Sequence, residues 1–427
     1  MSTRSRFRIA ALAVAAAAFA GCAADTVAGP STPTVSAVRP APHPGALVSL
    51  EWQAQARDLI AANRLSALAA GRVLAALSVA QHHAVQWSED ASPIGVLEPG
   101  PYVGAGVDPD VGPAPAADFA AAAYDAGGRA RREAQRGAVA GASARVLGFF
   151  FPAAVDALEQ RVRANGEEGA GRTHPHFTRG VATGQAAGDA AVERAKGDGF
   201  TKPWTGTVPV GAGMWIPSAL PPGGGTFGEV TPYFLSSNAQ FRPAPPPAFG
   251  SPAFAADVAE LRAMTESITP EQLAFARYWD FPGGTPTPIG YWNGVAAAYV
   301  ASHGLDERRA TEVLALTHAA VFDALIACWE AKYHYWTLRP TQADPAISLA
   351  FTLPNFPSYP SGHSCASASA GRVLAHFFPD RAAELAGWVG DAGLSRMLAG
   401  IHYRFDVTAG QELGRAVADL AIAHGAP

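Results

Sequence analysis

The sequence predicts an all-α protein made of two helical bundles, with its chemistry in the C-terminal bundle. Three observations predict this. Ala- and Leu-rich helical periodicity covers most of the chain, one long Pro/Gly-rich stretch divides it, and the motifs able to do chemistry all follow that stretch. With 427 residues, 49% of them hydrophobic, the chain is long enough for one large core or two packed units.

Residues 1–22 are typical of an export signal. A basic segment over 1–8 precedes an apolar run over 9–21, which is too short to span a bilayer comfortably. The run ends in Phe19-Ala20-Gly21-Cys22, which resembles a bacterial lipobox with Phe19 in place of the usual aliphatic residue. We therefore expect lipidation at Cys22 and a periplasmic or outer-surface lipoprotein, with plain secretion as the alternative.

The rest of the chain divides by composition. Residues 23–48 are rich in Pro, Ala, Ser and Thr, which is typical of a flexible linker. The predicted parts that follow are an N-terminal helical bundle over 49–200, a Pro/Gly-rich irregular connection over 201–252 and a C-terminal catalytic bundle over 253–427. No stretch after the signal reaches about 18 uninterrupted apolar residues, so membrane attachment is expected only through a lipid anchor.

Two segments of the chain resemble each other. The apolar helical pattern over 72–87 is similar to that over 312–329, and both end near a tryptophan. This similarity fits two related bundles of which the first lacks the catalytic residues.

Composition also limits the partners. The formal net charge is -5 and no Lys/Arg cluster is present, so we expect no nucleic-acid partner. Apart from Cys22 there are two cysteines, Cys328 and Cys365. They could pair in an exported protein, but two small buried residues are the favoured interpretation.

The first motif contains one of only three lysines in the chain. Lys332 and Arg339 are seven residues apart, or two helical turns, so a continuous helix would place both cations on one side. Pro340 is expected to end that helix at Arg339. Two cations on one face repel each other unless an anion lies between them.

The second motif is Pro360-Ser361-Gly362-His363. Ser361 is predicted to cap the helix that follows, whose N-terminal N–H groups and dipole suit an anion. Gly362 allows a close backbone approach, and His363 is a candidate acid/base.

The third motif runs from Arg396 to Asp406. A continuous helix would place Arg396 and His402 about 120° apart, so we expect a break near Gly400. Asp406 follows His402 by four residues, and in a helix its carboxylate could hold the imidazole N–H.

Together and in this order, the motifs match K-x6-RP, PSGH and SR-x5-H, and the sequence resembles the vanadium-dependent haloperoxidase and type 2 phosphatidic acid phosphatase (PAP2) superfamily. The resemblance implies that Lys332, Arg339, Arg396, Ser361 and Gly362 bind vanadate or phosphate. It implies that His363 is the acid/base. His402 would be the vanadium ligand, or the nucleophile that becomes phosphohistidine in a phosphatase, with Asp406 behind it.

The choice between the two chemistries stays open at this point. Trp329 and Phe356 occupy positions similar to the halide-side aromatic residues of haloperoxidases, which favours oxidation of halide by hydrogen peroxide on an organic acceptor, with vanadate as cofactor. The alternative is an exported acid phosphatase that acts on phosphate esters without a cofactor. A non-catalytic oxyanion-binding lipoprotein is disfavoured, because simple binding does not need the His402–Asp406 pair. A homodimer is expected from the family.

Overall fold

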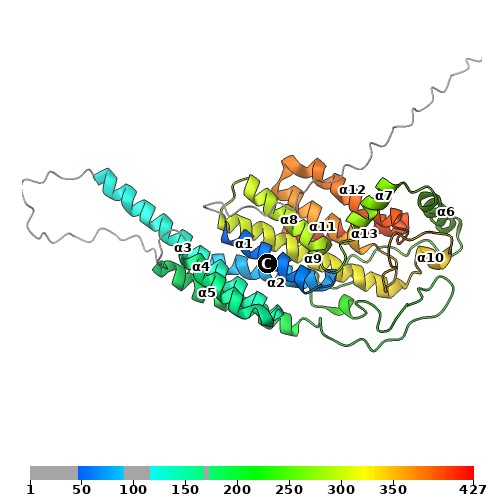
Figure 1. Ribbon diagram of the computed structural model, residues 1–427, viewed down its shortest axis with the longest axis horizontal. Coiled ribbons are helices and arrows are strands. Elements are labelled where there is room, and N and C mark those ends of the chain that lie inside the picture. The colour runs from blue at the N-terminus through cyan, green and yellow to red at the C-terminus, as the bar shows by residue number, and fades with distance from the viewer. Residues whose placement is uncertain (1–46, 91–115, 168–172) are drawn as a thin grey trace, which may run out of the picture. The chain divides into compact units, whose positions relative to one another are not determined.

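The computed structural model describes residues 47–90, 116–167 and 173–427 (Figure 1). These residues form thirteen α-helices and no strand, which confirms the all-α prediction. The predicted signal, Cys22 and all but the last two residues of the 23–48 linker lie outside the described residues.

The N-terminal helices form one group. They are α1 (Val48–Ala62), α2 (Ala67–Asp90), α3 (Ala116–Phe150), α4 (Val155–Glu167) and α5 (Pro175–Gly197). Helix α2 packs on both α3 and α5, and α3 packs along α5.

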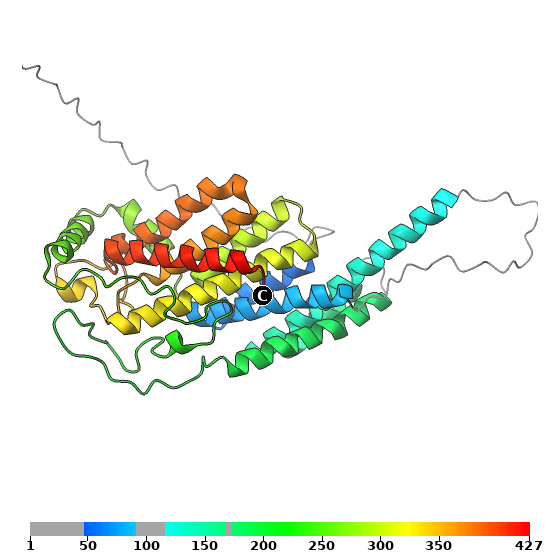
Figure 2. The ribbon, with the colours of Figure 1, turned by 180° about the vertical axis from the view of Figure 1, so that it is seen from behind.

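The C-terminal helices form the second group. They are α6 (Pro252–Glu266), α7 (Pro270–Tyr278), α8 (Thr287–Ser302), α9 (Glu307–Tyr335), α10 (Pro340–Ala343), α11 (Gly362–Phe377), α12 (Ala382–Leu398) and α13 (Arg404–His424). Helix α13 lies along α9 and α11, as Figure 2 shows from behind. Helix α9 is long and apolar enough to cross a membrane, but 94% of its most apolar window is buried in the protein. It is therefore the central core helix, and α2 packs against it from the first group.

The similarity between the two groups is present in three dimensions. The α1–α2 and α8–α9 hairpins turn through loops with the same conformation, with a left-handed residue at Arg64 (φ 51°) in one and Gly304 (φ 63°) in the other. In each loop the next leucine donates its N–H to the fifth residue before it, Leu65 to Ile60 at 3.1 Å and Leu305 to Val300 at 3.2 Å. Helices α2, α3 and α5 pack together as α9, α11 and α13 do.

Equivalent positions of the two hairpins meet inside the core. Asn293 of α8 donates to Gln53 of α1 at 2.8 Å, and these residues have the same place in their hairpins. Gln53 also donates to Ser78 of α2 at 2.9 Å, while Asn293 lies 2.7 Å from His318 of α9. Because all four polar side chains are buried, this network specifies how the two bundles join.

The predicted irregular connection ends one residue early, because Pro252 begins α6. Residues 201–251 contain one short 3-10 turn, Phe227–Glu229, within an otherwise irregular path. The buried carboxylate of Asp323 on α9 accepts N–H groups of Tyr233 and Phe234, both at 2.7 Å. Just beyond the C-terminal end of α9, the Trp215 N–H donates to the Trp336 carbonyl at 2.7 Å. The segment is thus bound to α9 along its length, including the end that carries the first motif.

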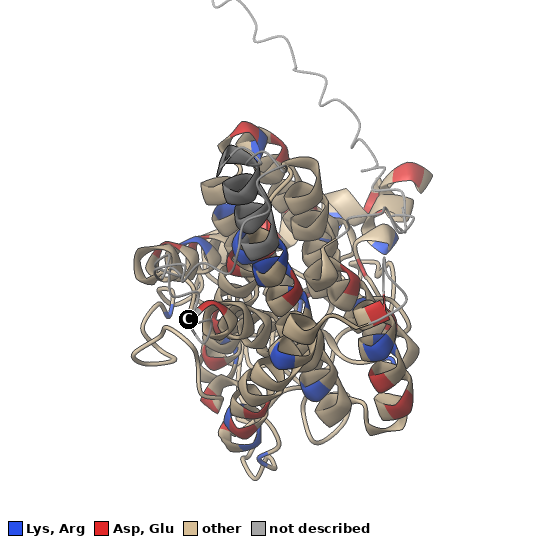
Figure 3. Ribbon diagram, turned by 90° about the vertical axis from the view of Figure 1, so that its left-hand side faces the viewer, with Lys and Arg blue, Asp and Glu red and all other residues tan. Residues whose placement is uncertain are grey.

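Charged residues are sparse on the fold. In the view of Figure 3, Lys and Arg are interspersed with Asp and Glu along the helices. This distribution agrees with the low charged fraction of 16%.

Candidate active site

The three sequence motifs converge where α9 ends and where α11 and α13 begin. Lys332 lies in the last turn of α9, Ser361 is the N-cap of α11, and His402 directly precedes the N-cap of α13. The Ser361 N–H donates to the Asp406 carbonyl at 2.9 Å, which joins the two helix starts. Two positive helix ends therefore lie side by side, an arrangement suited to an anion.

Lys332 holds the loop before α11. Its Nζ donates to the carbonyls of Pro357, Ser358 and Pro360 at 3.0, 2.8 and 2.6 Å, so all three ammonium donors are used. The side chain is fully buried, and burial lowers the pKa of Lys332 to about 8. Lys332 thus sets the shape of the 357–360 loop and places a positive charge beneath it.

Arg339 reaches the site by a different route from the one predicted. Helix α9 ends at Tyr335, and Trp336 follows in a left-handed conformation (φ 50°). Pro340 then begins the short helix α10 instead of ending α9. The prediction of a continuous helix from Lys332 to Arg339 is therefore wrong; a sharp turn brings the two cations together.

The Arg339 guanidinium is buried among acceptors. Its Nε donates to the Phe356 carbonyl at 3.0 Å, and its Nη1 donates to the Ile401 carbonyl at 2.7 Å and to His402 Nε2 at 3.2 Å. Among the described residues, Arg339 Nη2 has no hydrogen-bond partner. Burial lowers the pKa of Arg339 to about 10, because the buried guanidinium has lost its hydration and no carboxylate in the described part of the chain is bound directly to it.

His402 is backed by a carboxylate and a hydroxyl. His402 Nδ1 lies 2.8 Å from Asp406 Oδ2, and the same oxygen accepts the Ser358 hydroxyl at 2.5 Å. The predicted break lies at Gly400 (φ 73°), two residues after α12 ends. Since α13 begins only at Arg404, Asp406 reaches His402 across the helix N-terminus and not along one helical face, as the sequence had suggested.

The electrostatics assign the proton on His402. Burial raises the pKa of Asp406 to about 6, against the opposing hydrogen bond from Ser358, so the carboxylate is ionised at neutral pH. Burial and then the Arg339 cation lower the pKa of His402 well below its ordinary value. The hydrogen bonds imply a neutral imidazole that donates Nδ1–H to Asp406 and keeps a lone pair on Nε2.

The end of α7 holds the other two charged motif residues. His363 Nε2 donates to the Trp279 carbonyl at 3.0 Å. Arg396 donates to the Ala276 carbonyl at 2.9 Å and lies 3.6 Å from Asp280. Burial, followed by Arg396, lowers the pKa of His363 well below its ordinary value, and burial lowers that of Arg396 to about 10. Both also lower the pKa of His402.

Ser361 and Gly362 lie where the sequence places them. Ser361 Oγ caps α11 by accepting the Ser364 N–H at 3.4 Å. A Cβ added at Gly362 would lie 3.0 Å from the Trp329 ring, so the backbone approaches that ring closely. Trp329 and Phe356 are in contact, with ring centroids 5.1 Å apart.

These two rings form an aromatic wall beside the cations. Lys332 Nζ lies 5.5 Å from the Trp329 ring centroid and 5.2 Å from that of Phe356. The Arg339 guanidinium carbon lies 4.9 Å from the Phe356 centroid. The two rings thus lie against the buried cations Lys332 and Arg339.

Sequence reasoning missed two residues, Ser358 and Asp280. Ser358 lies just before the second motif, and its position three residues before Ser361 was the only signal for it. Asp280 lies far from every motif, and nothing in its sequence neighbourhood points to Arg396. Cys328 and Cys365 are both free and buried.

The site suits an anion better than a bare cation. Three buried cations, Lys332, Arg339 and Arg396, face the buried Asp406 and the partly exposed Asp280. Buried charges need partners, and the surplus here is positive. Within the described residues, no three His, Cys, Asp or Glu side chains gather as a metal-cation site.

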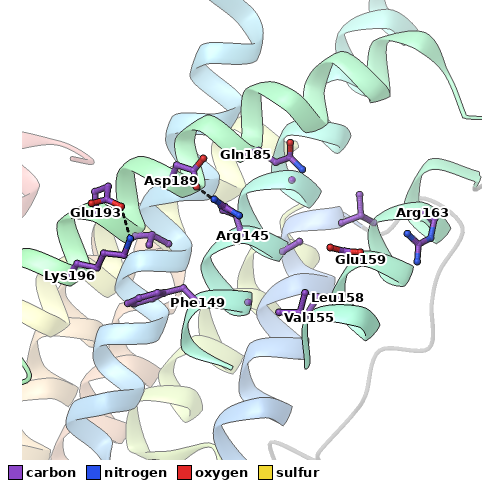
Figure 4. Close-up of a pocket in the computed structure, with 15 residues that line it drawn as sticks. Arg145, Phe149, Val155, Leu158, Glu159, Arg163, Gln185, Asp189, Glu193 and Lys196 are labelled. Carbon is purple, nitrogen blue, oxygen red and sulfur yellow. Dashed lines mark hydrogen bonds and ion pairs between the residues drawn. The ribbon is translucent and has the colours of Figure 1, made fainter. Parts of the chain in front are cut away.

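A separate groove of about 560 Å³ lies between α3, α4 and α5 (Figure 4). It has an apolar floor that includes Phe149 and Leu158, and its rim ion pair of Arg145 with Asp189 is self-contained. None of the motif residues lines it.

Comparison with known proteins agrees with this geometry. Residues 310–424 match the family model described as the PAP2 superfamily. The chain is 45% identical over 84 residues to the non-specific acid phosphatase of Salmonella typhi, a match that spans 19% of this chain and only 30% of that protein.

Solved structures share the fold over most of the chain. A bacterial vanadium-dependent iodoperoxidase superposes with a TM-score of 0.68 at 22% identity, covering 88% of this chain and 95% of that one. The apo form of a bacterial vanadium-dependent chloroperoxidase gives 0.61 at 16% identity, with 83% and 92% covered. The part of the chain that matches the PAP2 superfamily model, residues 310–424, thus includes the helices that carry the candidate site.

Proposed function

We propose that this protein is a vanadium-dependent haloperoxidase-like enzyme that oxidises halide with hydrogen peroxide. The observation that carries the proposal is the buried Arg339 Nη2, which has no partner among the described residues although Nη1 of the same group lies 3.2 Å from His402 Nε2. A buried guanidinium donor without an acceptor is costly, and an oxyanion bound beside His402 would supply that acceptor.

The residues present fit vanadate. His402 Nε2 would bind the metal in place of its hydrogen bond with Arg339 Nη1, which lies 3.2 Å away. Arg339 and Arg396 would neutralise the oxyanion, with Lys332 adding positive charge through the loop that it holds. When bound, vanadate supplies an electrophilic centre that activates peroxide toward halide.

The chain's own residues prepare this chemistry. Asp406, held by Ser358, keeps the proton of His402 on Nδ1 and so leaves Nε2 basic. Burial and then Arg396 lower the pKa of His363, which favours its neutral form. A bound anion would raise that pKa and enable His363 to take up and return a proton. The aromatic wall of Trp329 and Phe356 excludes water from one side of the site, which would help to strip water from a bound halide.

The test is bromination of monochlorodimedone with bromide and hydrogen peroxide in phosphate-free buffer. The purified protein is assayed before and after loading with orthovanadate, and the His402→Ala variant serves as control. Activity that appears only with vanadate and only in the unaltered protein supports the proposal. A folded protein that binds vanadate without halogenating would overturn it.

An acid phosphatase is the second candidate, favoured by the 45% identity to the Salmonella typhi enzyme over 84 residues. His402 Nε2 would attack phosphorus, and the phosphorus–oxygen bond to the leaving group would break while His363 donates the proton to that oxygen. Hydrolysis of p-nitrophenyl phosphate, inhibited by vanadate, is the outcome that would favour this candidate.

Location and assembly are also proposals. The signal over 1–22 supports export, and Cys22 supports a lipid anchor. A shift of the full chain into the detergent phase that is lost on Cys22→Ser would support the anchor. Sedimentation would test the homodimer.

A further inference from the structure

Three glycines from the irregular connection, Gly223 to Gly225, cross directly over the aromatic wall. We call them the glycine strap. The Gly223 carbonyl accepts both the Tyr333 hydroxyl at 2.7 Å and the Trp329 Nε1–H at 3.2 Å. The Gly223 N–H donates to the Asn355 carbonyl at 2.7 Å, next to Phe356. One residue therefore holds both halves of the wall.

The next residue of the strap leaves no room for a side chain. Gly224 has a φ of 71°, which favours glycine. A Cβ there would lie 2.4 Å from Trp329 Nε1, 2.7 Å from its Cδ1 and 2.8 Å from Leu68 of α2. The strap is thus in direct contact with the five-membered edge of the Trp329 ring.

The opposite edge of the same ring faces the oxyanion site. A Cβ added at Gly362 would lie 3.0 and 3.1 Å from Cζ3 and Cη2 of Trp329. Trp329 is therefore held between Gly224 and the first residue of α11, and is only 5% exposed. Pressure on one edge must move the other edge toward Gly362, because the ring is rigid and closely packed.

We propose that the strap, through Gly224, is a specificity-determining element of this site. It sets the position of the Trp329 wall, and so sets how large a group an oxyanion ligand can carry on that side. The inference shares one assumption with the proposed function, namely that the site binds an oxyanion. It applies to vanadate and to phosphate ligands alike. The expected ligands are oxyanions whose attached group is compact or flat.

The test compares two ligands that differ only on the wall side. Affinities for inorganic phosphate and for phenylphosphonate are measured by calorimetry on the full protein. Gly224→Ala is expected to lower the phenylphosphonate-to-phosphate affinity ratio about tenfold, equal to about 1.4 kcal/mol, while phosphate affinity stays within about threefold. Gly250→Ala is the matched control, because Gly250 has a φ of 78° but nothing within 4 Å of an added Cβ.

The double variant Gly224→Ala/Trp329→Phe tests the contact itself, since phenylalanine lacks the Nε1 atom that the new methyl group would meet. Its affinity ratio is expected to equal that of Trp329→Phe alone. If Gly224→Ala does not fold, Trp329→Phe alone decides the matter: its smaller ring should raise the phenylphosphonate-to-phosphate affinity ratio above that of the unaltered protein, and an unchanged ratio overturns the inference. A ratio unchanged within twofold in Gly224→Ala, or a double variant that differs from Trp329→Phe, would overturn the inference.

The two failures are distinguishable. If the unaltered protein binds neither phosphate nor phenylphosphonate, the oxyanion site fails, and the proposed function and this inference fall together. If it binds both and Gly224→Ala does not change the ratio, the inference alone fails.

Discussion

Removing the Ser358 hydroxyl should destabilise the protein in a way that depends on pH. Ser358 Oγ donates to Asp406 Oδ2 at 2.5 Å, and both residues are fully buried. A hydrogen bond to a buried charge contributes about 1.5–3 kcal/mol. Ser358→Ala leaves Asp406 Oδ2 with only His402 and the Tyr403 N–H as donors, so the ionised carboxylate loses its shortest hydrogen bond.

The sign follows from the pKa of Asp406, which burial raises from 3.8 to about 6. A raised carboxyl pKa favours the folded state below 3.8, and this contribution is lost as pH rises through 6. Ser358→Ala raises the folded pKa further, because the hydrogen bond that opposed the shift is gone. The loss of folding free energy should therefore be about 1.5–3 kcal/mol at pH 8 and smaller at pH 5, where the carboxyl is largely protonated.

Urea unfolding at the two pH values measures this difference. Ser364→Ala is the control, because Ser364 is equally buried and its hydroxyl has no partner among the described residues. We expect its effect to be small and independent of pH. Equal losses for Ser358→Ala at pH 5 and pH 8, or a Ser364→Ala variant as unstable as Ser358→Ala, would refute the reasoning.

Three further outcomes are expected. His402→Ala should abolish turnover and retention of vanadate, measured by metal content after desalting; retained activity would contradict the site. Lys332→Met should weaken phosphate affinity at least tenfold. It should also lower the unfolding free energy by about 3 kcal/mol, because three backbone carbonyls lose their hydrogen-bond donor. A variant as stable as the unaltered protein would contradict the role of Lys332 in holding the loop. Gly400→Ala should lower the melting temperature more than Gly304→Ala does. Both glycines have a positive φ, but only at Gly400 would the added Cβ meet a backbone atom, the Ser348 carbonyl oxygen at 2.2 Å. Equal losses in the two variants would contradict the predicted clash.

Lys332 and Arg339 show where prediction from local pattern succeeds and fails. The motifs name both as candidate site residues, and the structure buries both beside the loop before α11. Their relation along one helix does not, because α9 stops at a left-handed Trp336. A helix end of this kind depends on what the following residues contact, and Trp336 is held by Trp215 from the irregular connection.

His402 and Asp406 give a second case. Their spacing correctly indicated a contact, and the glycine before them correctly indicated a break. The helical geometry assumed for the contact was wrong, since Asp406 lies in the first turn of α13 and His402 precedes it. The side chain of an acidic residue in the first turn of a helix can accept a hydrogen bond from a donor that precedes the helix, and this produces the same pairing of Asp406 with His402.

The motifs named the charged candidate residues through a family resemblance, and the sequence by itself determined the helical class, the Ser361 cap and the break at Gly400. Each depends on interactions among residues a few positions apart, so nearby residue types are sufficient. Only the tertiary structure decided that Ser358 supports Asp406, that Asp280 and the end of α7 hold Arg396 and His363, and that the glycine strap presses on Trp329. These contacts join separate helices and loops, and the partner of a buried donor depends on how whole elements pack, which no local pattern encodes.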